Sequence, residues 1–261
     1  MIDEALLAEA ARSAGLSPFS AIVERLDGGR RERAEAQPWL PLYPASMIKL
    51  PIAAAAWSRI AAGKLSPEQP VTVSESNLTP NDAPSPIRAG YVCPAGELIE
   101  LMLARSDNVA TNQLIDLLGR EEITAYCHAI GLERTFVRRK LSGAEPLIED
   151  PQATGRNAHP AGDAAALLAA LDARRLPGSG ELLAILAQQW WRGKLPLGLQ
   201  AGDHLAHKTG DTDEVSHDGG ILTLSSGRRY AVVLYTGVRS PDEDPRFGAW
   251  MRIVRRAMAE D

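Results

Sequence analysis

Apolar and polar positions alternate near the N-terminus in a way that predicts two paired strands. Residues 19–26 alternate well enough for a strand, and a second strand is expected at 31–36. The sequence Asp27-Gly28-Gly29 between them is typical of a tight turn. Residues 2–14 carry apolar positions at helical spacing, which predicts an amphipathic helix ahead of the first strand.

The last quarter of the chain shows the same strand pattern. We expect strands at 204–208, 219–224 and 229–236, the last two joined by a hairpin turn at Ser225-Ser226-Gly227. A helix over 244–260 closes the chain. Strands therefore lie at both ends of the sequence.

Between these ends, helical periodicity dominates. The helices expected from apolar spacing, and from glycines just beyond the ends of several of them, cover residues 46–63, 96–103, 108–118, 121–130, 160–171 and 181–191. A short strand is expected near 71–73 inside a proline-rich loop, and 141–160 forms a polar loop.

This order of elements favours an α/β fold of the α+β type. An antiparallel sheet is flanked by the N- and C-terminal helices and joined to an all-helical lobe. We expect residues 1–45 and 196–261 to form a discontinuous α/β lobe and residues 46–195 to form the helical lobe.

Composition narrows the range of partners. The chain has 261 residues, 45% hydrophobic and 23% charged, with a formal net charge of −5 and no large basic cluster. These values argue against a nucleic-acid or membrane-surface role. A small-molecule substrate and a monomeric protein are expected. No apolar stretch approaches the roughly 20 residues that span a bilayer.

The start of the chain and its two cysteines bear on its compartment. The first residues lack the basic and apolar regions of a secretory signal, so the sequence as written predicts a cytoplasmic protein, or a periplasmic or secreted one if a signal has been removed. Cys93 and Cys127 are too few for a disulfide framework and are expected to be free.

The first candidate for chemistry is Ser46-Met47-Ile48-Lys49, where the 46–63 helix begins. Residues three apart share a helix face, so the lysine can lie beside the serine. A buried lysine can lose its proton and then serve as the base that a serine nucleophile needs. Taken alone the motif is weak, because serine is also a favoured residue at helix N-termini.

Two further short motifs follow. Ser106-Asp107-Asn108 lies between two predicted helices, where Ser106 could pass a proton and Asn108 could bind an amide. Lys208-Thr209-Gly210 lies on a predicted strand, where Lys208 and Thr209 could bind a carboxylate and Gly210 allows close approach to the backbone. Each motif alone is also explained by a helix cap or a surface strand end.

The three motifs occur together and in a specific order. Ser-x-x-Lys, Ser-Asp-Asn and Lys-Thr-Gly form the set found in class A β-lactamases and penicillin-binding proteins, each in the matching structural context. The chain resembles the class A β-lactamase family over about residues 19–258. The resemblance implies a β-lactamase/transpeptidase-like fold, a serine nucleophile, and no metal or other cofactor.

The resemblance also implies roles for individual residues. Ser46 would be the acylated nucleophile, Lys49 its proton partner, and Ser106 a proton shuttle to the leaving nitrogen. Asn108 would hold the substrate side-chain amide, and the backbone N–H groups of Ser46 and Asp211 would form the oxyanion hole. Lys208, Thr209 and Gly210 would form the carboxylate-binding strand. A carboxylate at Asp211 is unexpected beside an anionic substrate.

The chain departs from the family in the loop that carries the deacylating glutamate. The family pattern resembles Glu-Pro-x-x-Asn, whereas this chain reads Glu145-Pro146-Leu147-Ile148-Glu149. Glu145 is the candidate base and Glu149 its rival, and a solvated acidic loop explains both. His217 occupies a region that in the family often holds a basic residue for the carboxylate, although a structural histidine at a strand end is the simpler interpretation.

Three functions remain open at this level. The first is a hydrolase that opens β-lactam amides through an acyl-enzyme on Ser46. The second is a related penicillin-binding-type acylase, D-alanyl peptidase or esterase with slow β-lactam turnover. The third is a non-catalytic protein that binds β-lactams or peptidoglycan fragments.

Overall fold

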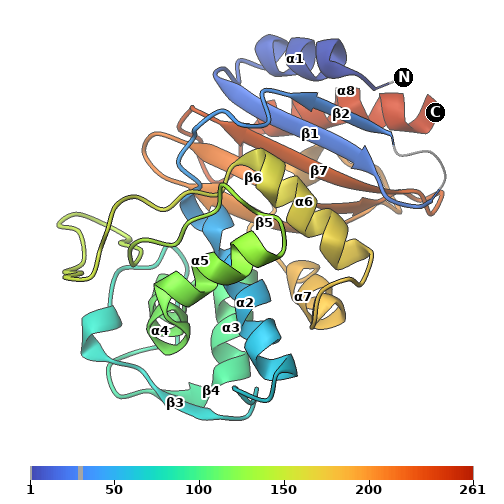
Figure 1. The fold of residues 1–261 in the computed structure, drawn as a ribbon. Coiled ribbons are helices and arrows are strands. Elements are labelled where there is room, and N and C mark those ends of the chain that lie inside the picture. The colour runs from blue at the N-terminus through green and yellow to red at the C-terminus, as the bar shows by residue number, and fades with distance from the viewer. Residues whose placement is uncertain (1, 29–31, 261) are drawn as a thin grey trace.

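One five-stranded antiparallel sheet organises the chain in a computed structural model that describes residues 2–28 and 32–260 (Figure 1). The strand order is β2-β1-β7-β6-β5, which brings the two ends of the sequence together in one sheet. Its strands are β1 (Phe19–Arg25), β2 (Arg33–Ala36), β5 (His204–Asp211), β6 (Ser216–Thr223) and β7 (Arg229–Thr236). All five predicted strands of this sheet are confirmed, while Gly29 of the predicted turn and residue 31 lie outside the described residues.

The two terminal helices cover one face of this sheet. α1 (Glu4–Ser13) and α8 (Pro245–Glu260) pack against each other over the strands, as Figure 1 shows. Asp3 caps α1 by accepting a hydrogen bond from Leu6 N at 2.8 Å. The indole of Trp250 is fully buried in this layer and donates from Nε1 to Leu7 O at 3.3 Å.

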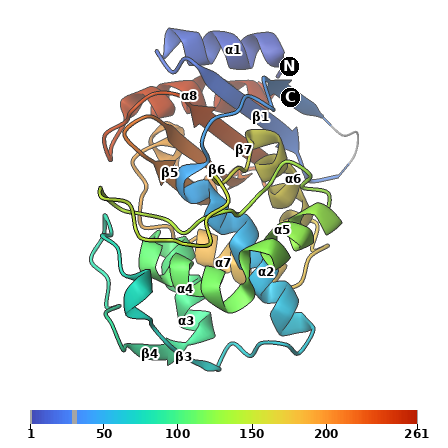
Figure 2. The same ribbon diagram turned by 60° about the vertical axis from the view of Figure 1, so that its left-hand side comes forward.

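The opposite face of the sheet packs on the helical lobe. α2 (Lys49–Ala61) runs through the centre of that lobe (Figure 2). The alanines at 53–56 are buried, and their small side chains let neighbouring helices approach closely. The surrounding helices are α3 (Ala95–Ala104), α4 (Asn108–Leu118), α5 (Arg120–Ala129), α6 (Ala161–Asp172) and α7 (Ser179–Leu186).

α6 joins the two parts of the molecule. It contacts β1, β6 and β7, and the apolar core of the helical lobe continues onto sheet residues such as Ile22 and Val233. The proposed lobe boundaries at 45/46 and 195/196 stay a prediction. Among the described residues, no helix is both long and apolar enough to cross a bilayer.

The start of the predicted 46–63 helix differs in detail. Residues Ala45–Ile48 form a 3₁₀ helix, η1, and the α-helix begins only at Lys49. Pro51 then occupies the first turn of α2, where a missing N–H costs nothing because that group has no intrahelical partner. The tighter η1 turn carries Ser46, so this local difference matters for the site.

Four short elements and one helix end also differ from the prediction. The strand expected at 71–73 is β3 (Pro70–Thr72), and it pairs with β4 (Val92–Pro94), which was not predicted. The 3₁₀ helices η2 (Glu75–Asn77) and η3 (Leu195–Gly198) are also too short for a periodic signal. α7 ends at Leu186, five residues before the expected end at Trp191.

Trp250 should be a main stabilising contact of the outer layer. We expect Trp250→Ala to lower the free energy of unfolding by about 3–5 kcal/mol, because it removes a fully buried aromatic side chain and leaves a cavity. Trp190→Ala, at a side chain that is 59% exposed, is the matched control and should change stability by about 1 kcal/mol or less. Urea unfolding measures both, and equal losses would contradict this description of the core.

Candidate active site

Ser46 lies where the helical lobe meets the edge of the sheet. It follows Ala45, whose φ of 46° is in the left-handed region that non-glycine residues rarely adopt. This turn, together with the η1 helix, places Ser46 directly ahead of α2. Among the described residues, neither the backbone N–H nor the hydroxyl of Ser46 has a hydrogen-bond partner within the protein. Both groups are therefore available to a substrate.

The end of edge strand β5 packs against this turn. A Cβ atom added at Gly210 would lie 3.0 Å from Ser46 N and 3.1 Å from Pro44 O, which is closer than side chains ordinarily tolerate. Only glycine lets β5 approach the nucleophile turn this closely. The geometry brings Ser46 N next to the backbone that leads into Asp211, as the predicted oxyanion hole requires.

Ser106 lies opposite, in the short loop between α3 and α4. Its φ of 61° makes it the second non-glycine residue of the site in the left-handed region. Asp107 fixes the loop by capping α4, since its Oδ1 accepts from Ala110 N at 2.8 Å. Strain of this kind, held in place by a buried cap, is typical of functional loops.

Two lysine side chains converge on the hydroxyl of Ser106. Lys49 Nζ lies 3.1 Å from Ser106 Oγ, and Lys208 Nζ lies 2.9 Å from the same atom. The lysines come from α2 and β5, which are 159 positions apart in the sequence. The structure thus brings together one residue from each of the three predicted motifs.

Lys49 is fully buried, and its amino group has three oxygen neighbours. Besides Ser106 Oγ, it donates to Ser106 O at 2.6 Å and to Asn108 Oδ1 at 2.8 Å. Burial, and then repulsion from Lys208, hold the pKa of Lys49 well below its usual range. Within the described part of the chain no carboxylate forms an ion pair with Lys49, so its neutral form is favoured.

Lys208 is also fully buried. Burial lowers its pKa to about 7, opposed mainly by the negative charge of Asp211. It donates to Thr209 O at 2.8 Å in addition to Ser106 Oγ. The two amino groups share one hydroxyl, and placing two positive charges there would be unfavourable. One of the two is therefore expected to be neutral near neutral pH.

Asn108 follows Ser106 by two residues, and both ends of its side-chain amide are engaged. Oδ1 accepts from Lys49, and Nδ2 donates to Pro80 O at 3.1 Å. In this arrangement Asn108 positions Lys49. The role expected from the resemblance, holding a substrate amide, stays a prediction.

Asp211 is compensated by a lysine that the sequence analysis missed. Lys194 Nζ lies 2.7 Å and 2.6 Å from the two carboxylate oxygens of Asp211, and the Lys194 side chain is only 3% exposed. This ion pair offsets the negative charge of Asp211, a residue that the sequence analysis did not expect beside an anionic substrate. A lone lysine in the loop before η3 carries no sequence motif, so only the fold could reveal it.

Glu145 is not part of this cluster. Its loop starts close to the site, since a Cβ at Gly143 would lie 3.2 Å from Asn108 Nδ2. The Glu145 carboxylate, however, is solvent-exposed and accepts from Leu147 N, two residues along its own loop, at 3.1 Å. Glu149, the rival candidate, is also exposed and lines a separate charged pocket with Lys140 and Arg120. Neither carboxylate contacts Lys49 or Ser46 in this structure.

His217 is a structural residue. Its Nδ1 accepts from Thr236 N at 3.2 Å, so Nε2 carries the proton and donates to Tyr43 O at 2.7 Å. Burial lowers its pKa to about 4, and the ring stacks on Tyr235 at a centroid distance of 4.1 Å. A neutral, doubly bonded histidine holds the segment before Ser46 and provides no positive charge for a carboxylate.

The profile of the β-lactamase enzyme family matches residues 2–258. The chain belongs to the β-lactamase enzyme family. A search of curated proteins found no match.

Solved structures of the β-lactamase family and of PBP-A superpose over nearly the full length. PBP-A covers 98% of this chain and 97% of its own at 24% identity, with a TM-score of 0.86. A PBP-A mutant described as an acyl-enzyme complex with penicillin G is 25% identical over the full length of both chains, with a TM-score of 0.85. An ancestral class A β-lactamase, GNCA, is 25% identical, covers 97% of this chain and 99% of its own, and has a TM-score of 0.82. The expected β-lactamase/transpeptidase-like fold is confirmed.

The buried charge of Lys208 predicts a pH dependence of stability. Its pKa in the folded β-lactamase-like protein is about 7, below the ordinary value of 10.5. The unfolded chain therefore binds more protons between these values, and the stability contribution of Lys208 rises with pH across that window. Between about pH 7 and pH 9 the free energy of unfolding should increase by about 2 kcal/mol more in the native protein than in Lys208→Met. Denaturant unfolding at both pH values measures this, and identical pH dependence would contradict the buried, pKa-lowered state.

Proposed function

We propose that this β-lactamase family member is a serine acyl-transfer hydrolase that β-lactams acylate on Ser46 and that releases the acyl group slowly. The observation that carries the proposal is the Ser106 hydroxyl held by both Lys49 and Lys208. Ser46 lies three residues before Lys49 and has no hydrogen-bond partner for its hydroxyl among the described residues. The acyl-enzyme described for the PBP-A mutant supports the same chemistry in a similar structure.

Acylation follows from the proton positions in this cluster. A neutral Lys49 accepts the Ser46 hydroxyl proton as Oγ forms a bond to the lactam carbonyl carbon. The carbonyl becomes a tetrahedral oxyanion, which the N–H groups of Ser46 and Asp211 stabilise. The proton passes through Ser106 Oγ to the lactam nitrogen as the carbon–nitrogen bond breaks. An ester on Ser46 and the opened amine remain.

Lys208 and Lys194 supply the electrostatics around this step. A substrate carboxylate next to Lys208 would favour its charged form and pair with it and with the Thr209 hydroxyl. Proton uptake by Lys208 on binding in turn favours a neutral Lys49 through charge repulsion. Lys194 keeps the Asp211 carboxylate paired, so that this carboxylate does not repel the substrate.

Deacylation distinguishes the first two of the three functions considered. Water must attack the ester, and a general base near Lys49 and Ser46 would speed that attack. Glu145 and Glu149 are both outside the cluster, which favours a penicillin-binding-type acylase with slow turnover over a fast β-lactamase. The lowered pKa of Lys49 disfavours a purely non-catalytic binding protein, because simple capture does not need a base.

Intact-mass spectrometry with benzylpenicillin tests both halves of the proposal. We expect a single retained adduct on the native protein, none on Ser46→Ala, and an unchanged adduct on Ser58→Ala, a serine on the other end of α2. Lys49→Met should slow adduct formation by at least about 100-fold, because the serine loses its base. Absence of an adduct together with absence of hydrolysis would refute acylation at Ser46.

The loop glutamates are tested by adduct lifetime. Since neither carboxylate contacts the site, Glu145→Gln and Glu149→Gln should each change the rate of adduct loss by no more than about twofold, well below the roughly 10²–10⁴-fold effect of a general base. A native adduct that disappears within seconds, and persists in Glu145→Gln, would instead identify a true β-lactamase with Glu145 as its base.

A further inference from the structure

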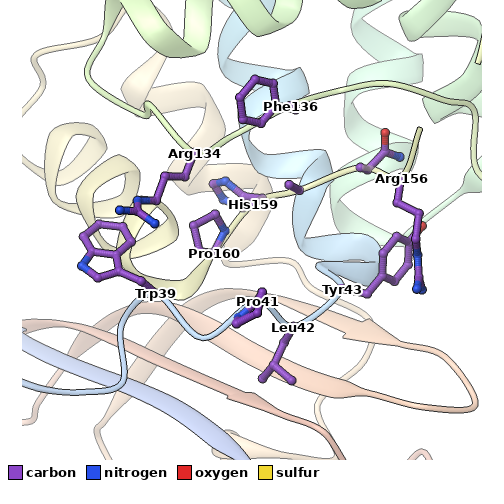
Figure 3. Close-up of a pocket in the computed structure, with 11 residues that line it drawn as sticks. Trp39, Pro41, Leu42, Tyr43, Arg134, Phe136, Arg156, His159 and Pro160 are labelled. Atoms are coloured by element: carbon purple, nitrogen blue, oxygen red, sulfur yellow. The ribbon is translucent and has the colours of Figure 1, made fainter. Parts of the chain in front are cut away.

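A cavity lies between the segment before Ser46 and two further segments of the chain, residues 134–136 and 156–160. Neither Lys49 nor Lys208, the two residues of the lysine cluster, lines it. Its volume is about 290 Å³, just below the roughly 300–1,000 Å³ typical of small-molecule sites. Figure 3 shows its wall side chains. They are contributed by residues 39–43, by Arg134 and Phe136, and by residues 156–160. The last two groups are joined by an antiparallel bridge between Phe136 and Ala158.

Arginines and aromatic rings are paired around this cavity. Arg134 Cζ lies 5.0 Å from the ring centroid of Trp39, and Arg156 Cζ lies 4.7 Å from that of Tyr43. The two pairs lie at opposite ends of the cavity in Figure 3. A third arginine, Arg138, lies 4.1 Å from the ring of the lining residue Phe136 but does not itself line the cavity. The apolar faces are thus combined with guanidinium groups that present fixed hydrogen-bond donors.

These positive charges are poorly balanced. In the described part of the chain Arg134 forms no ion pair within 4.0 Å, and the carboxylate on which its charge acts is Asp163, which is buried beneath it. Arg156 lies 3.7 Å from Glu214, but the two side chains are 69% and 75% exposed, so the pair contributes little. In a protein with a formal net charge of −5, two such arginines in the walls of one cavity favour an anionic ligand.

At one end of the cavity, the indole of Trp39 packs directly against the backbone of α6. A Cβ at Gly162 would lie 2.4 Å from Trp39 Cζ3, so the indole rests directly on the first turn of α6. Trp39 is 46% exposed, which is unusual for a large ring held this tightly. An exposed, fixed aromatic face is typical of a binding surface.

The floor of the cavity contains an unsatisfied acceptor. Thr135 Oγ1 donates to Asp163 Oδ2 at 2.8 Å, so His159 Nδ1 must donate to Thr135 Oγ1, also at 2.8 Å. His159 Nε2 is then a buried acceptor, and no described residue donates to it. Buried polar atoms normally have partners, so this atom adds an unpartnered acceptor to walls that also contain Arg134 and Arg156.

We propose that this cavity binds a small organic anion that has an aromatic ring and a carboxylate. The ring packs between the Trp39 and Tyr43 ends against Phe136 and Pro160, and the carboxylate pairs with the guanidinium of Arg134 or Arg156. The site is separate from the lysine cluster and does not depend on the proposed acylation.

Calorimetric titration with phenylacetate, and with phenylacetamide as its neutral isostere, tests the site. We expect one phenylacetate per chain, and at least about tenfold weaker binding of the amide because it lacks the charge-assisted contact. Arg134→Gln and Arg156→Gln should each weaken binding by about fivefold or more. Arg88→Gln is the matched control, because Arg88 also packs on an aromatic ring but does not line this cavity: its Cζ lies 5.9 Å from the centroid of the Tyr91 ring. The Arg88→Gln variant should bind phenylacetate as the native protein does.

Four results would overturn the proposal. They are no phenylacetate binding at millimolar concentration, equal binding of the amide, an equal loss in Arg88→Gln, and binding that Lys208→Gln abolishes while Arg134→Gln and Arg156→Gln leave it intact. The last result would place the anion at the lysine cluster instead.

Discussion

Two buried lysines that share the hydroxyl of Ser106 are the interaction on which the site depends. Lys49 Nζ and Lys208 Nζ lie 3.1 Å and 2.9 Å from one oxygen, with both side chains fully buried. Burial lowers the pKa of both lysines, and repulsion from Lys208 lowers the pKa of Lys49 further. A resting protein with one neutral lysine has a base ready for Ser46. A substrate anion that favours the charge on Lys208 would strengthen that bias.

The rest of the fold brings three segments that are distant in sequence to the Ser106 hydroxyl: the turn with Ser46, the loop with Ser106 itself, and strand β5. The all-antiparallel sheet brings β5 to its edge, where Gly210 lets the strand reach the turn that carries Ser46. The left-handed residues Ala45 and Ser106 are strained positions on the two sides of the cluster. Such strain persists only when the surroundings fix it. Here the cap from Asp107 and the bond from His217 to Tyr43 O supply that support.

Much of this arrangement could be predicted from the sequence, because strands and long helices leave periodic signals and the three motifs have fixed spacing. The five strands of the main sheet and the α4 helix illustrate this. Partners that depend on tertiary packing could not be predicted. Lys194 has no motif, yet it neutralises Asp211. The engagement of Asn108 by Lys49 and Pro80, and the outward Glu145 carboxylate, are likewise properties of loops in space.

Acylation of Ser46 as proposed requires Lys49 to be neutral in the resting protein. This requirement is tested most directly by NMR on protein with ¹³C-labelled lysine, with the Lys49 Cε resonance assigned by its loss in Lys49→Met. We expect a Cε chemical shift characteristic of a free amine at neutral pH, which moves to that of an ammonium group only on acidification. A Lys49 resonance that stays in the ammonium position until about pH 10, like an ordinary lysine, would contradict the neutral state of Lys49.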